Sequence, residues 1–267
     1  LEAFCDQHGV AWQQTGKVIV ATHEKQLPAL ERIFARGQQN GVRSEMIDVE
    51  RLKELEPHCA GVKAIHVPES GIVDYPGVCT KLAEILQQHG ADIRLGCKVT
   101  GLKQTTDAVT VTTSTDTVEA AQVVNCTGLF SDRIARLSGQ QMKERIVPFR
   151  GEYFVLKPEA EHLCRTLIYP VPDPDFPFLG VHFTRMIEGG VECGPNAVLA
   201  LAREGYSWSS INPRDLWESL TYPGFLRLAA RHWRGRPRGR QRARQILGWS
   251  GFGAVLLRRR VRDGHGV

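Results

Sequence analysis

A change of hydrophobic period near the middle of the chain limits the possible folds more than any other feature. Residues 75–88 carry one apolar stripe at helical spacing, and Gly90 follows as the expected left-handed end of that helix. Beyond Gly90 the apolar residues alternate as they do in strands. The predicted strands are 93–95, 98–103, 108–113 and 117–120. The apolar run 122–126 then predicts a buried strand, so this order indicates a mixed α/β fold that contains a β-meander.

The first third of the chain has a similar mixture of strands and helices. A short β-branched run at 17–22 predicts a buried strand, and the apolar spacing of 24–39 predicts a helix. Asp48 is a suitable N-cap for a second, short helix that Pro57 ends. Residues 62–67 alternate as a further strand.

The segment after residue 146 indicates an antiparallel sheet. Its expected strands are 152–156, 166–170, 178–184 and 190–193. An amphipathic stretch follows at 212–233, and Pro223-Gly224 should kink or split it. We therefore expect a division of the chain into the segments 1–66, 67–145, 146–232 and an atypical basic tail, 233–267.

The net charge of +5 is misleading, because it arises at the C-terminal end. Residues 231–267 hold eleven arginines and one acidic residue, whereas the rest of the chain has a slight acidic excess. Such a body is unlike a nucleic-acid-binding domain, whose basic residues should share one folded face with aromatic ones. We expect no specific nucleic-acid partner.

The cysteines, the histidines and the apolar runs exclude other classes. The seven cysteines are an odd number and form no Cys-x-x-Cys pair, which indicates reduced thiols in the cytoplasm. The histidines in turns and polar faces lack the spacing of metal ligands, so no metal site is expected. No apolar run approaches the roughly 20 residues of a bilayer helix.

The turn after the predicted buried strand is the first candidate binding site. The strand 122–126 ends at Thr127-Gly128, and a helix capped by Ser131 or Asp132 begins just after it. At the carboxyl edge of an α/β sheet, glycine lets a ligand approach the backbone, and the helix start offers N–H donors to phosphate. Similar turns also occur for structural reasons alone. The motif therefore indicates a nucleotide site without excluding a structural turn.

The longer run 71–132 resembles the flavin domain of the D-amino-acid-oxidase-like flavoproteins. Gly96-Cys97-Lys98-Val99 is similar to a Gly-x-x-Val strand of that superfamily. The resemblance implies part of an FAD-binding, Rossmann-like domain with a β-meander, together with an antiparallel-sheet substrate domain. The backbone of Val99 is then expected near adenine, and Thr127 and Gly128 are expected to contact FAD. Asp132, at the following helix start, completes the predicted cofactor site.

Four further motifs resemble the L-2-hydroxyglutarate oxidase or dehydrogenase family within this superfamily. They are Pro148–Phe154, Tyr169–Pro174, Gly180–Arg185 and Gly194–Ala197. The resemblance covers about residues 1–232, and motifs of this length are far more specific than three-residue patterns. It implies an enzyme that oxidises L-2-hydroxyglutarate to 2-oxoglutarate by hydride transfer to FAD, with oxygen or a quinone-linked chain as electron acceptor.

The residues expected to act on the substrate lie in these motifs. Oxidising a 2-hydroxy dicarboxylate needs cations for two carboxylates and a group that takes the hydroxyl proton. Arg150 and Arg185 are the predicted carboxylate clamps, because a guanidinium group binds a carboxylate through two N–H donors. Tyr169 is a predicted hydrogen-bond donor, and His182 is the predicted proton acceptor.

Each of these roles has a structural alternative. The two arginines could form surface ion pairs, as most exposed arginines do. His182 could bond to a backbone carbonyl for structural reasons, and Tyr169 could simply pack. The resemblance also implies a further catalytic histidine upstream of this chain.

The resemblance implies segments that the sequence does not show. The family begins with a Gly-x-Gly-x-x-Gly unit for the FAD pyrophosphate and ends with a second flavin-binding segment, and we find neither. We therefore expect an interior fragment with uncovered apolar faces, poor solubility and negligible FAD affinity on its own. The basic tail 233–267 is expected to be out of frame or disordered, which the other two reading frames of the DNA test. A genuine tail for nucleic acid or anionic lipid is the alternative.

Two other functions remain open. One is a related flavoenzyme that acts on an amino acid or on glycerol 3-phosphate, and the other is an inactive remnant or binding module. Substrate profiling and flavin titration distinguish them. We expect a cytoplasmic location, with peripheral attachment of the parent protein to the inner membrane left open.

Overall fold

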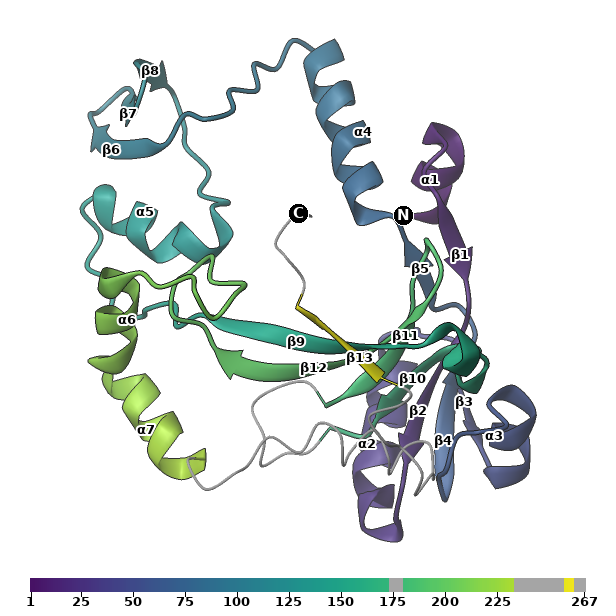
Figure 1. Ribbon diagram of the computed structural model, residues 1–267. Coiled ribbons are helices and arrows are strands. Elements are labelled where there is room, and N and C mark those ends of the chain that lie inside the picture. The colour runs from purple at the N-terminus through teal and green to yellow at the C-terminus, as the bar shows by residue number, and fades with distance from the viewer. Residues whose placement is uncertain (173–179, 233–256, 262–267) are drawn as a thin grey trace. The chain divides into compact units, whose positions relative to one another are not determined.

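The computed structural model describes residues 1–172, 180–232 and 257–261, and the structural statements below refer to them (Figure 1). The chain divides into two compact units. The first contains residues 1–82, 151–198 and 257–261, and the second contains residues 83–150 and 199–232. Both mix helices and strands, which confirms the predicted mixed α/β class. The stretch 199–232 groups with the meander, whereas we had expected it to accompany the antiparallel sheet.

The first unit is built around an eight-stranded mixed sheet. In spatial order its strands are β13 (Leu257–Val261), β9 (Phe149–Leu156), β12 (Val191–Leu199), β11 (His182–Arg185), β10 (Leu167–Pro170), β2 (Lys17–Ala21), β4 (Lys63–Val67) and β3 (Glu45–Ile47). The pairs β10–β11 and β11–β12 are antiparallel, as predicted. In contrast, β10 runs parallel to β2, so the sheet joins segments that are remote in sequence.

Strand β13 lies in the basic tail 233–267, which we expect to be out of frame or disordered. Its backbone pairs antiparallel with β9, from Leu257 opposite Leu156 to Val261 opposite Glu152. Residues 257–261 are thus described as a strand, and the rest of 233–267 lies outside the described residues. A neighbouring strand can supply the hydrogen-bond ladder, and the local period of a sequence does not report that contribution.

Short helices and a small two-stranded sheet complete the first unit. They are α1 (Glu2–His8), β1 (Trp12–Gln14), η1 (Glu24–Gln26), α2 (Leu27–Gln39), α3 (Val49–Leu55), β5 (Gly71–Val73) and η3 (Pro158–Leu163). As predicted, Asp48 caps α3, and its Oδ1 accepts a hydrogen bond from the backbone N–H of Arg51 at 2.8 Å. This bond satisfies one of the N–H groups that the start of a helix leaves without a partner.

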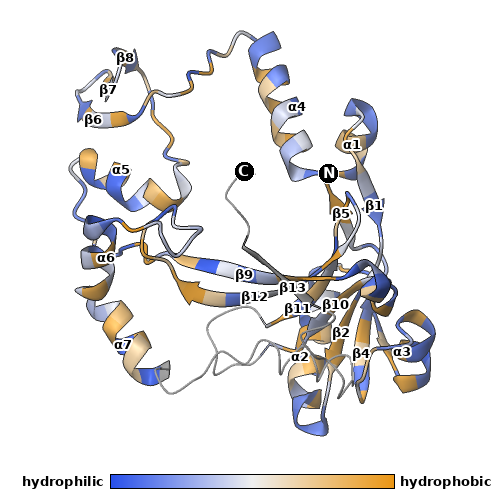
Figure 2. Cartoon of the chain, in the orientation of Figure 1, coloured by the Kyte–Doolittle hydropathy of each residue, from blue (hydrophilic) through white to orange (hydrophobic). Residues whose placement is uncertain are grey.

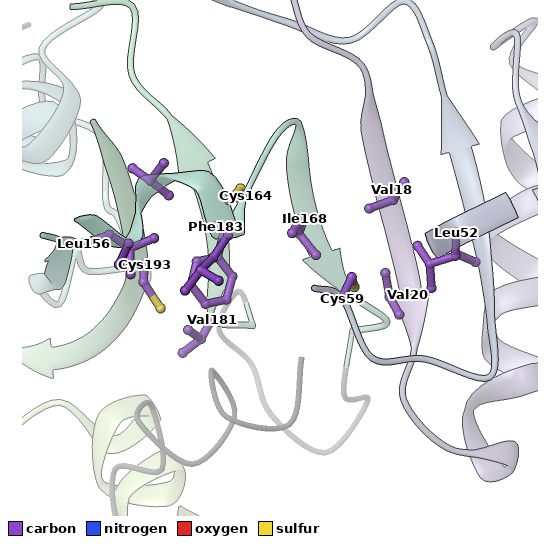
Figure 3. Packing of buried hydrophobic residues seen from close by; sticks show 14 of the residues in the cluster. Val18, Val20, Leu52, Cys59, Leu156, Cys164, Ile168, Val181, Phe183 and Cys193 are labelled. Carbon is purple, nitrogen blue, oxygen red and sulfur yellow. The ribbon is translucent and has the colours of Figure 1, made fainter. Parts of the chain in front are cut away.

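The main core of the first unit fills one face of its sheet. Val18, Ile168 and Phe183 lie side by side on three neighbouring strands and are completely buried (Figure 3). On the other face, Ile65 packs with Leu30 of α2, and Figure 2 shows hydrophobic residues gathered on β2, β4 and α2. A ligand site on β10 and β11 must therefore use the face opposite Phe183.

The second unit contains the predicted meander and two helical segments. Its elements are β6 (Val99–Gln104), β7 (Val109–Thr113), β8 (Thr117–Ala120), η2 (Gly128–Phe130), α5 (Ser131–Leu137), α6 (Pro213–Leu220) and α7 (Pro223–His232). α4 (Tyr75–Gln88) begins in the first unit and ends in the second. Two sequence predictions are confirmed here. Gly90 has a φ of +83° just after α4, and the helical stretch after residue 212 is split before Pro223.

The apolar run 122–126 forms no strand, which contradicts our prediction. Val124 within it is 82% exposed. The run 93–95 likewise forms no strand, and Leu95 is 88% exposed. A buried strand needs neighbours that complete its hydrogen bonds and cover its faces, and no strand borders these two runs within the described residues. Both runs therefore leave apolar surface uncovered, as expected from the sequence.

Candidate active site

Tyr169 and His182 form the centre of the candidate site in the first unit. Because Ile168 lies opposite Phe183 in the antiparallel pair β10–β11, Tyr169 and His182 are the next opposed residues. Their rings stack at a centroid distance of 4.2 Å, with 10° between the planes. Strand alternation turns both rings away from the Phe183 core. The structure therefore brings together two residues that the sequence analysis proposed separately.

Gly180 makes this arrangement possible. A Cβ atom at this position would lie 2.7 Å from Cγ of Pro170, closer than real Cβ atoms approach other atoms. Glycine therefore lets the chain before β11 pass close to the end of β10. The carbonyl oxygen of Gly180 lies 2.9 Å from Nδ1 of His182. Since a carbonyl only accepts, Nδ1 carries a proton, and Nε2 keeps its lone pair when the imidazole is neutral.

The surroundings of His182 favour the neutral imidazole. The residue is 7% exposed, and desolvation lowers its pKa below the ordinary 6.5. The hydrogen bond to Gly180 opposes this shift, whereas the positive charge of Lys17 adds to it. Buried Glu192 lies opposite Thr184 in the β11–β12 pair and so shares this face of the sheet. A neutral imidazole can accept a proton from a substrate hydroxyl.

Lys17, which no sequence motif indicated, also lies on this face. It precedes Ile19 by two residues on β2, and Ile19 lies opposite Tyr169, so alternation gives Lys17 and Tyr169 the same face. Its Nζ atom is 5.2 Å from the centroid of the Tyr169 ring, within cation–π range. The side chain is half-buried, and burial lowers its pKa. Only the parallel pairing of β2 with β10 could have indicated this residue.

Arg185 does not share the face of His182 in the structure, and its predicted contact with a substrate carboxylate stays a prediction. It lies three residues after His182 on β11, so alternation turns it toward the same face as Phe183. Its Nη1 donates to the carbonyl oxygen of Cys164, a buried core residue, at 3.3 Å. Because Arg185 lies three positions after His182 on β11, the two side chains lie on opposite faces of the sheet.

Arg150 belongs to the second unit and is buried there. Its Nη1 donates to the carbonyl oxygen of Ser207 at 3.2 Å. Its guanidinium carbon lies 4.1 Å from the centroid of the Trp208 ring. These contacts do not match the alternative of an exposed surface ion pair. Its predicted contact with a substrate carboxylate stays a prediction.

Three of the predicted cofactor residues fit an FAD site in the second unit. Gly128 has a φ of +50°, and a Cβ atom there would meet no atom within 4 Å, so the turn leaves room for a ligand. The exposed hydroxyl of Thr127 donates to Oδ1 of Asn125 at 2.7 Å. Val99 lies on β6, which borders only β7 among the described strands. One backbone edge of β6 is therefore suited to hydrogen bonding with a ring such as adenine.

Asp132, the fourth predicted cofactor residue, is held in an ion pair within the second unit. Its buried carboxylate binds the Arg203 guanidinium through two N–H donors, with Nη2 and Oδ2 2.8 Å apart. It also accepts the backbone N–H of Ile146 at 3.3 Å. Burial alone would raise the pKa of Asp132, but these bonds lower it to about 2. Both oxygens are engaged by the protein itself, so the position fits a structural ion pair better than an FAD ligand.

Arg203 is the centre of a buried ion-pair network in the second unit. Its guanidinium also donates to the carbonyl oxygen of Leu129 and to Glu218, and its backbone N–H donates to Asp215 at 2.8 Å. Arg133 of α5 binds Asp215 and Glu218 of α6. The network therefore links α5 and α6 with the segment that precedes α6.

Neither a metal-binding cluster nor a membrane-spanning helix is found in the described part of the chain. No group of three or more His, Cys, Asp or Glu residues in that part is placed to hold a metal ion. None of its helices has both the length and the apolar character needed to cross a bilayer. All seven cysteines lie within it as free thiols.

Comparison with known families decides the class of this protein. Residues 1–266 match the family described as FAD dependent oxidoreductase, or DAO. The chain belongs to this family. The predicted superfamily and its FAD-dependent class are thereby confirmed. The match continues past residue 232, where the resemblance in the quoted motifs ends, and the proposed out-of-frame origin of the tail stays a prediction.

Individual relatives of this FAD-dependent oxidoreductase agree in their names. The L-2-hydroxyglutarate dehydrogenase of Indibacter alkaliphilus is 48% identical over 236 residues, which cover 88% of this chain and 59% of that protein. The mitochondrial L-2-hydroxyglutarate dehydrogenase of Homo sapiens is 39% identical over 245 residues, covering 87% of this chain and 53% of that protein. The chain thus spans about half the length of these relatives. The mitochondrial relatives do not support a specifically cytoplasmic location.

Solved structures show the same fold. Glycine oxidase from Geobacillus kaustophilus has a TM-score of 0.65 at 15% identity, covering 98% of this chain and 64% of the oxidase. L-alpha-glycerophosphate oxidase from Mycoplasma pneumoniae with FAD bound has a TM-score of 0.64 at 25% identity, covering 73% of this chain and 52% of that oxidase. The predicted combination of flavin-domain and substrate-domain elements is that of this fold.

Proposed function

We propose that the protein containing this chain oxidises L-2-hydroxyglutarate to 2-oxoglutarate with FAD as cofactor. The observation that carries the proposal is the 48% identity to a relative named L-2-hydroxyglutarate dehydrogenase. The stacked pair of Tyr169 and His182 supports it, because this pair presents a buried neutral imidazole on the sheet face opposite the core. The proposed electron acceptor is oxygen or a quinone-linked chain.

In the proposed reaction, His182 takes the proton of the substrate hydroxyl. The Gly180 carbonyl holds the Nδ1 proton, so Nε2 is the accepting atom. Burial keeps the imidazole neutral before the reaction by lowering its pKa. As the proton moves to Nε2, the electron pair of the O–H bond forms the new carbonyl bond and hydride leaves carbon 2. Bound FAD supplies the acceptor for that hydride.

Other residues are proposed to hold the reactants. Val99, Thr127 and Gly128 would hold FAD, since the backbone edge and the turn that they form fit its adenine and its phosphate or flavin groups. Tyr169 would fix the plane of the imidazole by stacking and offer its hydroxyl to the substrate. Arg150 would bind one substrate carboxylate with its forked N–H donors.

A substrate panel with the FAD-loaded enzyme that carries this sequence tests the proposal. We expect L-2-hydroxyglutarate to give 2-oxoglutarate, with kcat/KM about 100-fold or more above that of D-2-hydroxyglutarate, glycine or glycerol 3-phosphate. Glycine and glycerol 3-phosphate each carry one anionic group, so a site built for two carboxylates keeps a buried cation unpaired with them. D-2-hydroxyglutarate also has two carboxylates, but holding both of them turns its C2 hydrogen away from the hydride acceptor. Similarity to L-alpha-glycerophosphate oxidase makes glycerol 3-phosphate the most informative competitor. Preferred oxidation of any competitor contradicts the proposal.

A further inference from the structure

The ammonium group of Lys17 is held at the candidate site without a role in the function proposed above. Its contact there is with the Tyr169 ring, at 5.2 Å from Nζ to the centroid. No carboxylate within the described residues forms an ion pair with it. A half-buried cation of this kind has lost part of its hydration, so an incoming anion interacts with it more strongly than in bulk water.

A dicarboxylate substrate needs a cation for each of its two carboxylates. Arg185 faces the core and bonds to Cys164, so it is not available on the face of His182. Lys17 is on that face, because its strand pairs with β10 in a register that puts Lys17 opposite Leu167, which shares the face of Tyr169. The buried acidic residue Glu192 on β12 also shares the face. Lys17 is therefore a cation that the sheet supplies on that face, next to Tyr169.

The position of Lys17 indicates which carboxylate it would meet. Strand β10 lies between β2 and β11, and the Tyr169 ring on β10 contacts both the ammonium of Lys17 from β2 and the imidazole of His182 from β11. The two groups therefore contact different parts of one substrate. His182 is assigned to the hydroxyl on carbon 2, which leaves the far end of the five-carbon chain for Lys17.

We propose that Lys17 binds the C5 carboxylate of the substrate and thereby selects dicarboxylates over monocarboxylates. The inference rests on the proposed function, since it takes L-2-hydroxyglutarate as the substrate. It adds a specificity-determining residue and requires no change in the proton transfer to His182. A variant without the ammonium should lose affinity for the far carboxylate and keep its affinity for the rest of the molecule.

Calorimetric titration of the FAD-loaded enzyme with two ligands tests this directly. The ligands are 2-oxoglutarate and 2-oxopentanoate, which has a methyl group in place of the far carboxylate. We expect Lys17→Gln to weaken 2-oxoglutarate binding by about 10- to 100-fold, as for a lost charge-assisted hydrogen bond, and to change 2-oxopentanoate binding by less than about threefold. Lys17→Arg should retain most of the preference. In kinetics, KM for L-2-hydroxyglutarate should rise more than kcat falls.

The controls separate this inference from the proposed function. Lys63→Gln, which alters another half-buried lysine of the same sheet at β4, should leave both affinities unchanged. If Lys17→Gln does not fold, Lys17→Met keeps the apolar stem and allows the same comparison. Equal weakening of both ligands, or no weakening, overturns the role of Lys17 while wild-type activity stands. Failure of the wild-type enzyme to bind 2-oxoglutarate overturns the proposed function as well.

Discussion

Replacing His182 with glutamine is expected to lower kcat/KM for L-2-hydroxyglutarate by about 100- to 10,000-fold, the usual contribution of a general base. Glutamine is similar in size and uncharged, but its amide cannot accept the hydroxyl proton. Most of the loss should fall on kcat, because substrate binding relies mainly on the cations around the site. Steady-state kinetics and the anaerobic rate of flavin reduction measure the effect.

A second histidine and the pH profile provide the controls for His182. His66→Gln changes a histidine of β4 whose Nδ1 lies 2.8 Å from Oε1 of Glu45, and it should leave activity nearly unchanged. Burial lowers the pKa of His182 below 6.5, so kcat/KM should rise with pH through that lowered value and level off above it. Retention of activity in His182→Gln, or of the same acidic limb, contradicts the assignment.

Replacing Arg203 with leucine is expected to reduce the free energy of unfolding of the second unit by about 3–5 kcal/mol, as when one partner of a buried ion pair is removed. The Arg203 side chain is 1% exposed, and its removal leaves the buried Asp132 carboxylate without its two guanidinium donors. Urea unfolding followed by circular dichroism measures the change. Arg214→Leu removes a 73% exposed partner of Glu218 and should scarcely shift the midpoint.

A double variant and the pH dependence test the cause of that loss. Arg203→Leu combined with Asp132→Leu removes both charges, so it should recover part of the stability. In the wild type, the pKa of Asp132 falls from 3.8 to about 2, so its stabilisation is complete above pH 3.8 and is lost as pH falls through about 2. If the double variant instead loses as much free energy of unfolding as the two single variants together, the Asp132–Arg203 ion pair does not determine the stability of this region.

Local patterns predicted those parts of the fold whose determinants lie close together in sequence. Asp48 and the N–H of Arg51, three residues apart, gave a correct helix start. The meander was also predicted correctly, because each of its strands pairs with the next along the chain. The run 122–126 was predicted wrongly for the opposite reason. Its apolar residues specify burial only if other strands cover them, and an apolar run does not show whether such neighbours are present.

In the candidate site, too, residues whose partners are close in sequence were predicted, and a residue whose partner is remote was not. Tyr169 and His182 were proposed from their motifs, and the hairpin-like pairing of β10 with β11 explains why they meet. The role of Arg185 was predicted from its motif alone, and in the structure strand alternation turns Arg185 to the face opposite His182. Lys17 was missed because it reaches the site through parallel pairing between segments about 150 residues apart, which no local period encodes.

The central claim is that the sheet face carrying Lys17, Tyr169 and His182 receives the substrate. A crystal structure of the FAD-loaded enzyme with 2-oxoglutarate bound tests it most directly. We expect one ligand oxygen within hydrogen-bond distance of Nε2 of His182 and the far carboxylate on Nζ of Lys17, with Arg185 still bonded to Cys164. A ligand bound away from this face, or held by Arg185 on the core side, would contradict the account.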